Sequence, residues 1–125
     1  MLLARLSLAL TLVLALAPSP ARAAAHDTPP DVAACITAAA KTFEMSELPL
    51  HVLYAMERGS VGRVSQNSNG TVDVGPMQVN SSWLRKLAPA GITLERLRDE
   101  VCTNVYVGTW IFYQEWQASK NIGMA

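Results

Sequence analysis

Several residue types are scarce in this chain of 125 residues. It contains two cysteines, two histidines and 6% aromatic residues. No HExxH or paired CxxC pattern is present, so the sequence predicts no metal site and no cofactor. The 10 basic side chains equal the 10 acidic ones, which gives a formal net charge of zero. Because there is no cluster of basic residues, the sequence gives no indication that the protein binds nucleic acid.

Long hydrophobic runs are also scarce. The apolar run Leu6 to Ala17 is shorter than the roughly 20 residues that a membrane-spanning helix needs. Arg5 precedes this run and Ala21-Arg22-Ala23 follows it, so residues 1–23 are predicted to be a secretory signal peptide. An uncleaved anchor is the alternative. We expect a periplasmic or secreted protein with no stable membrane span after cleavage.

The two cysteines, Cys35 and Cys102, are predicted to form one disulfide, because exported proteins oxidise their thiols. Such a bond would close a long loop and stabilise the fold by roughly 2–4 kcal/mol. A nucleophilic cysteine is the alternative, but no histidine lies near either residue in the sequence.

The remaining pattern predicts a mainly α fold with a small β element. Residues 24–30 are expected to be a flexible lead-in, and residues 31–125 a single domain. Asn69-Gly70 is a strong signal for a hairpin turn. Helical spacing predicts helices at 31–43, 48–57, 83–87, 94–98 and 101–119. The first, third and fourth of them are expected to be capped by Asp31, by Ser81 or Ser82, and by Thr93.

The chain around Glu57 and Asp73 is the most informative part. The helix at 48–57 is apolar on nearly all sides, so it is expected to be buried, with Glu57 at its end. A chain that folds back at Asn69-Gly70 would bring Asp73 towards Glu57. Two carboxyl groups placed in this way suit the cleavage of a glycosidic bond.

The stretch from Glu57 to Asn80 resembles the lytic transglycosylases of the lysozyme-like superfamily (the SLT domain). The matching residues are Glu57-x-Gly59 and the run from Asn67 through Gly75-Pro76-Met77-Gln78 to Asn80. Cys102-x-Asn104-Val105-x-x-Gly108 matches a second segment of the family, and Cys35 stands where these proteins place their first cysteine. The likeness is greatest to small exported members that accompany conjugation or secretion systems, including the TrbN-like proteins of plasmid transfer.

The resemblance implies a lysozyme-like fold and peptidoglycan glycan strands as the substrate. It implies that Glu57 is the catalytic acid and base, acting between N-acetylmuramic acid and N-acetylglucosamine and leaving a 1,6-anhydro product. Burial beside Met77 and Tyr54 would raise the pKa of its carboxyl. Conjugation or secretion machinery is the implied partner.

Met77, Gln78 and Asn80 match residues that line the family's substrate groove. The alternative for both amides is that they bond the backbone of their own turn. Gly75 is expected to let the backbone approach the sugar or the Glu57 helix. The tryptophans at 83, 110 and 116 are candidates to stack on sugars, although core packing is the commoner role for two of them.

Asp73 stands where animal lysozymes carry a second carboxylate, so a hydrolytic muramidase is one rival function. The alternative for Asp73 is that it bonds amides of the hairpin. A glycan-binding assembly factor without turnover is the second rival. Many family members have serine after the glutamate, where this chain has Arg58, and a Tyr-Asn pair after the last helix. This sequence lacks such a pair after its last helix. Either Tyr106 or Tyr113 replaces that tyrosine, or the chain is a short or truncated variant with reduced activity.

Overall fold

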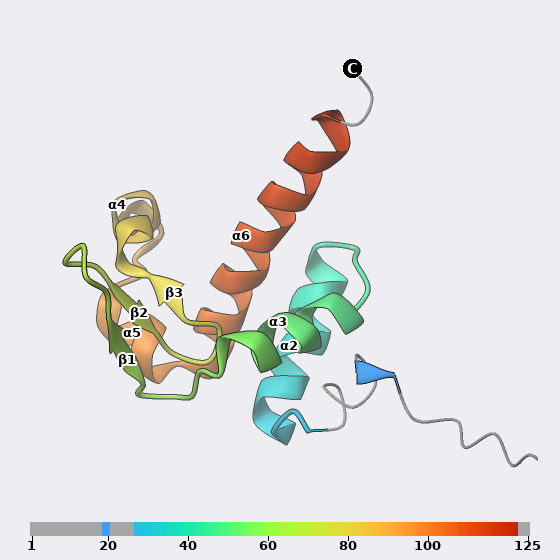
Figure 1. Cartoon of the computed structure of the whole chain (residues 1–125), viewed down its shortest axis with the longest axis horizontal. Coiled ribbons are helices and arrows are strands. Elements are labelled where there is room, and N and C mark those ends of the chain that lie inside the picture. Colours follow the sequence, from blue (N-terminus) through green and yellow to red (C-terminus); the bar gives the residue numbers. More distant parts are fainter. Residues whose placement is uncertain (1–18, 21–26, 123–125) are drawn as a thin grey trace, which may run out of the picture.

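The computed structural model describes residues 19–20 and 27–122. Of the predicted signal peptide 1–23, only positions 19–20 are among the described residues. Residues 24–26 of the lead-in also lie outside the described residues. The elements follow one another along the chain (Figure 1) as α2 (Pro30–Thr42), α3 (Leu48–Glu57), β1 (Val64–Gln66), β2 (Val72–Val74), β3 (Val79–Asn80), the 3-10 turn η1 (Ser81–Trp83), α4 (Leu84–Leu87), the 3-10 turn η2 (Ala88–Ala90), α5 (Leu94–Asp99) and α6 (Val101–Ile122).

The fold is organised around α6, which packs against α2 on one side and against α5 and β3 on the other. Figure 1 shows this helix passing between the α2–α3 pair and the small sheet, with its C-terminal turns extending past the other elements. One core joins the two sides. Its fully buried side chains include Ile36 of α2, Leu50 of α3, Val74 of β2, Leu97 of α5 and Val105 of α6.

The sheet has three antiparallel strands in the order β1-β2-β3. Val64 pairs with Val74 and Gln66 with Val72, which centres the connection on Asn69 as predicted. The third strand, β3, is not among the predicted elements. In this two-residue strand Asn80 pairs with Asp73 and Val79 pairs with Val74. The architecture is therefore mainly α with a small antiparallel sheet, consistent with the lysozyme-like fold class.

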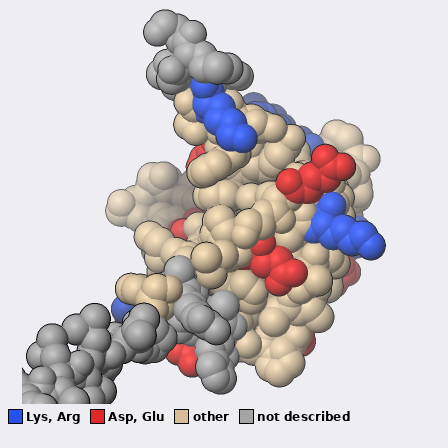
Figure 2. Space-filling view, turned by 90° about the vertical axis from the view of Figure 1, so that its right-hand side faces the viewer, with Lys and Arg blue, Asp and Glu red and all other residues tan. Residues whose placement is uncertain are grey.

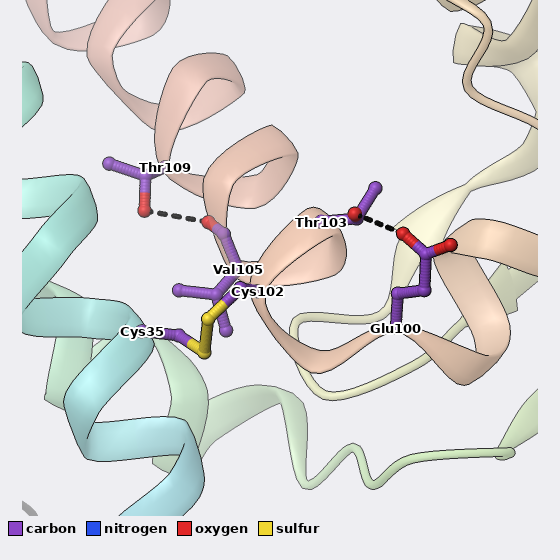
Figure 3. The surroundings of a disulfide bond; sticks show 6 residues. All are labelled: Cys35, Glu100, Cys102, Thr103, Val105 and Thr109. Atoms are coloured by element: carbon purple, nitrogen blue, oxygen red, sulfur yellow. Dashed lines mark hydrogen bonds between the residues drawn. A yellow bond between two sulfur atoms is a disulfide. The ribbon is translucent and has the colours of Figure 1, made fainter.

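Helix α2 and helix α6 are joined by the predicted disulfide between Cys35 and Cys102. The two Cα atoms lie 4.9 Å apart, and 67 residues separate the cysteines in the chain. Figure 3 shows the bond at the first turn of α6, where the hydroxyl of Thr103 donates a hydrogen bond to Glu100. The bond therefore closes a loop that contains α3, the whole sheet and α5.

Helix α3 has the predicted bounds, but the expectation that it is buried on nearly all sides is wrong. Of its ten residues only Leu50 and His51 are buried, and Met56 is 74% exposed. The physical reason is that its main helical partner is α2, which covers one side of a short helix. The remaining side, with Leu53, is left to line a groove.

Two predicted caps are also wrong. Asp31 lies in the first turn of α2 without a capping hydrogen bond, since Pro30 begins the helix one residue earlier. The turn before α4 is capped by Asn80, whose side chain accepts from the Ser82 N–H, rather than by Ser81 or Ser82. Thr93 caps α5 as expected, by accepting from the Arg96 N–H.

The end of the expected lead-in packs against the domain. Thr28 is buried, and its hydroxyl lies 2.8 Å from Nδ1 of His51 in a hydrogen bond. Thr28 therefore contacts α3, and Pro30 already belongs to α2. His51 is held between this hydroxyl and Glu47, at 3.7 Å from its carboxylate, which is a structural role.

Charge is distributed without a large patch of one sign on the face seen in Figure 2. There, acidic and basic side chains are interspersed on a mostly uncharged surface. Arg96 and Glu100 form one of the ion pairs, and Arg98 and Asp99 form another. Within the described part of the chain, no helix combines the length and the apolar character needed to cross a membrane.

Candidate active site

A groove of about 220 Å³ lies between the end of α3, strand β3 and the middle of α6. One wall carries Glu57 and the other is a stripe of α6, while the turn that follows β2 forms the floor. The lining residues are Leu53, Glu57, Met77, Gln78, Val79, Asn80, Trp83, Gly108, Ile111, Phe112 and Glu115. The structure thus brings four of the predicted site residues, Glu57, Met77, Gln78 and Asn80, into one concave surface.

Glu57 is the last residue of α3. The chain leaves the helix through Arg58, which adopts the left-handed conformation with φ of 52°. Glu57 is exposed at the groove and not buried as the sequence suggested, because only one side of α3 is covered. No hydrogen bond or ion pair links it to another described side chain. Partial desolvation raises the pKa of its carboxyl above the ordinary value, and the negative charge of Asp73 raises it further.

Asp73 lies in the middle strand, and both of its oxygens are occupied. Oδ2 accepts a hydrogen bond from Asn67 at 3.0 Å, and Oδ1 accepts one from Asn80 at 2.8 Å. Asp73 does not line the groove. The structure therefore places this carboxylate close enough to act on Glu57 through its charge, while its hydrogen bonds tie it to side-chain amides of the sheet.

The groove floor is held by Asn104, a fully buried residue of α6. Its Oδ1 accepts from the backbone N–H of Met77 at 2.7 Å. Its Nδ2 donates to the carbonyls of Val74 and Leu97, both at 2.8 Å. One side chain therefore satisfies backbone groups of β2, the Met77 turn and α5, and fixes the floor to the central helix.

Two glycines allow close contacts between the groove walls and the turn after β2, because neither has a Cβ atom. A Cβ at Gly59 would lie 2.2 Å from the Gly75 carbonyl oxygen, so the chain leaving Glu57 touches the turn directly. A Cβ at Gly108 would lie 2.6 Å from Cβ of Met77. Gly75, where the sequence predicts a close approach, supplies the carbonyl next to Gly59. It has φ of +75°, and a Cβ there would meet the side chain of Asn104 and the carbonyl of Leu97.

The amides of Gln78 and Asn80 are largely engaged within the protein. Gln78 Oε1 accepts from the Ser65 hydroxyl at 2.7 Å, and its Nε2 donates to the Gly75 carbonyl at 3.1 Å. Asn80 Nδ2 donates to Thr71 and Asp73, and its Oδ1 accepts from the Ser82 N–H. These contacts favour the structural alternative for Asn80. Gln78 keeps one N–H of its amide available to the groove.

The structure does not place Tyr106 or Tyr113 where either could replace the tyrosine that the resemblance implies. Both rings pack against Phe43 of the α2–α3 connection, at centroid distances of 5.1 and 5.4 Å. Neither residue lines the groove. The reason is the helical period, since these two positions lie seven residues apart on the face of α6 that meets Phe43.

The aromatic wall of the groove comes from Trp83 and Phe112. Trp83 packs edge-on against Trp110 at 5.6 Å. Sequence reasoning did not assign Phe112, Glu115 or Asn104 to the site. Gly108, Ile111, Phe112 and Glu115 recur at i, i+3, i+4 and i+7, so the helical period was the signal that would have found this wall.

The groove therefore offers one carboxyl with a raised pKa facing a cavity with aromatic, methionine and amide walls. Such a group can hold a proton nearer to neutral pH than a free glutamate and donate it to a bound molecule. Among the described residues, no group of three or more His, Cys, Asp or Glu side chains is placed to hold a metal ion.

Comparison with known proteins gives a partial match. No protein-family model matches the chain. The invasion protein IagB of Salmonella typhimurium strain SL1344 is 31% identical over 78 residues, which are 62% of this chain and 49% of that protein. IagB of strain LT2 and IagB of Salmonella typhi match to the same extent. The chain spans about half the length of the curated relatives it matches.

Proposed function

We propose that the protein is a peptidoglycan lytic transglycosylase, which cleaves the β-1,4 bond between N-acetylmuramic acid and N-acetylglucosamine. The observation that carries this proposal is the state of Glu57. It is a groove-lining carboxyl whose pKa is raised by desolvation and by the charge of Asp73. A carboxyl that keeps its proton is what the departure of a sugar alcohol requires.

In the proposed reaction Glu57 acts first as an acid and then as a base. Its proton passes to the glycosidic oxygen as the bond to the muramoyl C1 breaks, which releases the next sugar as an alcohol. The carboxylate that remains accepts the proton of the muramoyl C6 hydroxyl, whose oxygen bonds to C1. The products are a 1,6-anhydro ring and a free 4-hydroxyl, and Glu57 is protonated again without the consumption of water.

The placement of Asp73 supports this reaction over hydrolysis through a second carboxylate. A retaining hydrolase needs its nucleophile roughly 5–5.5 Å from the acid and directed at the sugar. Here both oxygens of Asp73 accept from Asn67 and Asn80, and the residue does not line the groove. Its charge acts on Glu57 instead. A muramidase of the same fold is the second candidate. The observation that favours it is that Asp73 lies near enough to Glu57 for its charge to raise the pKa of that carboxyl.

We further propose that the enzyme is exported and opens local gaps in the cell wall for a conjugation or secretion machine. The disulfide between Cys35 and Cys102 supports an oxidising compartment such as the periplasm. The similarity to IagB, which is named an invasion protein, is a second observation in support of this proposed role.

Mass spectrometry of digested sacculi tests the reaction. The parent protein should release muropeptides with 1,6-anhydro ends, one water lighter than hydrolysed products. Glu57→Gln should lower the rate by roughly 10²–10⁴-fold, the usual contribution of a general acid. Reducing-end muropeptides alone would establish the muramidase instead. Binding to sacculi by both proteins, with no soluble fragments from either, would establish a glycan-binding factor.

A further inference from the structure

The last turns of α6 have no packing partner in the described part of the chain. All residues from 114 to 120 are exposed, and Figure 1 shows this part of the helix extending past its neighbours. Trp116 lies there and is 48% exposed. About half of the surface of this side chain is therefore open to contact with a ligand.

Trp116 continues the groove wall. The stripe of α6 that lines the groove ends at Phe112 and Glu115. The rings of Phe112 and Trp116 are stacked, with centroids 6.2 Å apart and an angle of 29° between their planes. Because α6 rises about 1.5 Å per residue, Trp116 stands about 12 Å along the helix from Gly108 at the floor. An aromatic surface therefore leads from the groove to the open end of α6.

Two polar groups lie at this end of the groove. The carboxylate of Glu115 lines the groove and makes no hydrogen bond or ion pair with a described residue, so it is free to accept from a ligand. The ammonium group of Lys120 lies over the Trp116 ring, 5.4 Å from its centre. An aromatic ring next to a groove wall that offers an acceptor suits a pyranose ring, which presents C–H groups on its face and hydroxyl or amide groups on its edge.

We propose that Trp116 forms an outer glycan subsite at a distance from the cleaved bond. A hexosamine ring stacks there in place of the Lys120 ammonium, with Glu115 accepting from its hydroxyl or amide groups. This proposal deepens the proposed function and rests on it, since it takes the same glycan strand as its ligand. The site extends the groove beyond its enclosed part. It thereby favours long strands over short fragments.

Calorimetry in the Glu57→Gln background tests the subsite without turnover. The probes are the hexamer and the dimer of β-1,4-linked N-acetylglucosamine. We expect Trp116→Ala to weaken hexamer binding about tenfold, which corresponds to roughly 1.4 kcal/mol, and to leave dimer binding unchanged. Trp116→Phe should recover part of the hexamer affinity. Gln114→Ala is the matched control, because it is exposed two residues away on a different face of α6.

Cleavage of long strands gives the second readout. With Glu57 intact, Trp116→Ala should raise KM on sacculi about tenfold and leave kcat unchanged. Equal hexamer affinity for Glu57→Gln with and without Trp116→Ala would overturn the subsite. If the parent cleaves no glycan but Trp116→Ala still weakens hexamer binding, the subsite stands and the proposed enzymatic function fails.

Discussion

The side-chain oxygen of Asn104 lies 2.7 Å from the backbone nitrogen of Met77, across 27 positions of sequence. This hydrogen bond joins the central helix to the turn that forms the floor of the groove. Asn104 also donates to the carbonyls of Val74 and Leu97, so three backbone segments depend on one amide. The position of the floor is thus set from within the core and not from the surface.

Asn104→Ala should destabilise the protein by roughly 2–4 kcal/mol, since it leaves one N–H and two carbonyls buried without partners. Chemical denaturation measures this loss. Asn104→Asp is the informative companion, because it retains an acceptor for the Met77 N–H but loses both donors. A free energy of unfolding within 0.5 kcal/mol of the parent for Asn104→Ala, about the effect of an ordinary surface change, would contradict the role given to this amide.

Glu57→Gln should stabilise the fold at pH 7. The pKa of Glu57 is raised in the folded state, so ionisation costs stability as the pH rises through that pKa. Glutamine does not ionise, and its advantage should vanish below about pH 4, where glutamate is protonated in both the folded and unfolded states. Thermal unfolding at pH 7 and pH 3 checks this. A parent melting temperature at pH 7 equal to or above that of the variant would refute it.

Asp73→Asn should shift the pH dependence of cleavage. Activity falls on the alkaline side as Glu57 loses its proton, and Asp73 contributes to the raised pKa of that group. Removing the charge should move the alkaline limb of kcat/KM to lower pH. The shift should be partial, because desolvation is the larger cause.

Asn67→Ala is the matched control for this profile. It removes one hydrogen bond to Asp73 but keeps the charge, so it should change stability and leave the alkaline limb in place. If both variants gave the parent profile, Asp73 would have no electrostatic effect on the acid.

Removing the disulfide with Cys35→Ala and Cys102→Ala together should cost roughly 2–4 kcal/mol, because 67 residues separate the two cysteines and the unfolded chain gains much freedom. Denaturation of the oxidised parent, the reduced parent and the double variant measures the cost. The reduced parent should resemble the double variant. Coincident transitions for all three would show that the bond adds nothing.

The sequence was sufficient for the elements whose signals are local. The bounds of α3, the hairpin around Asn69, the Thr93 cap and the pairing of the two cysteines are all confirmed. Each depends on a short pattern or on cysteine count. The gathering of Glu57, Met77, Gln78 and Asn80 at one groove also matches the expectation from the family resemblance.

The errors concern burial and partners, which depend on tertiary packing. The apolar pattern of α3 predicted burial on nearly all sides, but α2 covers only one side of this helix. The sequence also does not show that Gln78 and Asn80 bond Ser65, Thr71 and Asp73, because the pairing of the strands brings these partners together. Similarly, the direction of Tyr106 and Tyr113 towards Phe43 depends on where α2 crosses α6.

Helix α6 is a single uninterrupted helix that carries Cys102 of the disulfide, Asn104, Gly108 in contact with Met77, and Phe112 of the groove wall. Inserting a single residue between Asn104 and Gly108 would rotate everything beyond it by about 100° relative to the anchor. Phe112 and Glu115 would then turn away from Glu57 although no side chain had been changed. The number of residues between Asn104 and Glu115 is therefore as important for the groove as the identity of these residues. Insertions and deletions in related sequences should lie outside this part of α6.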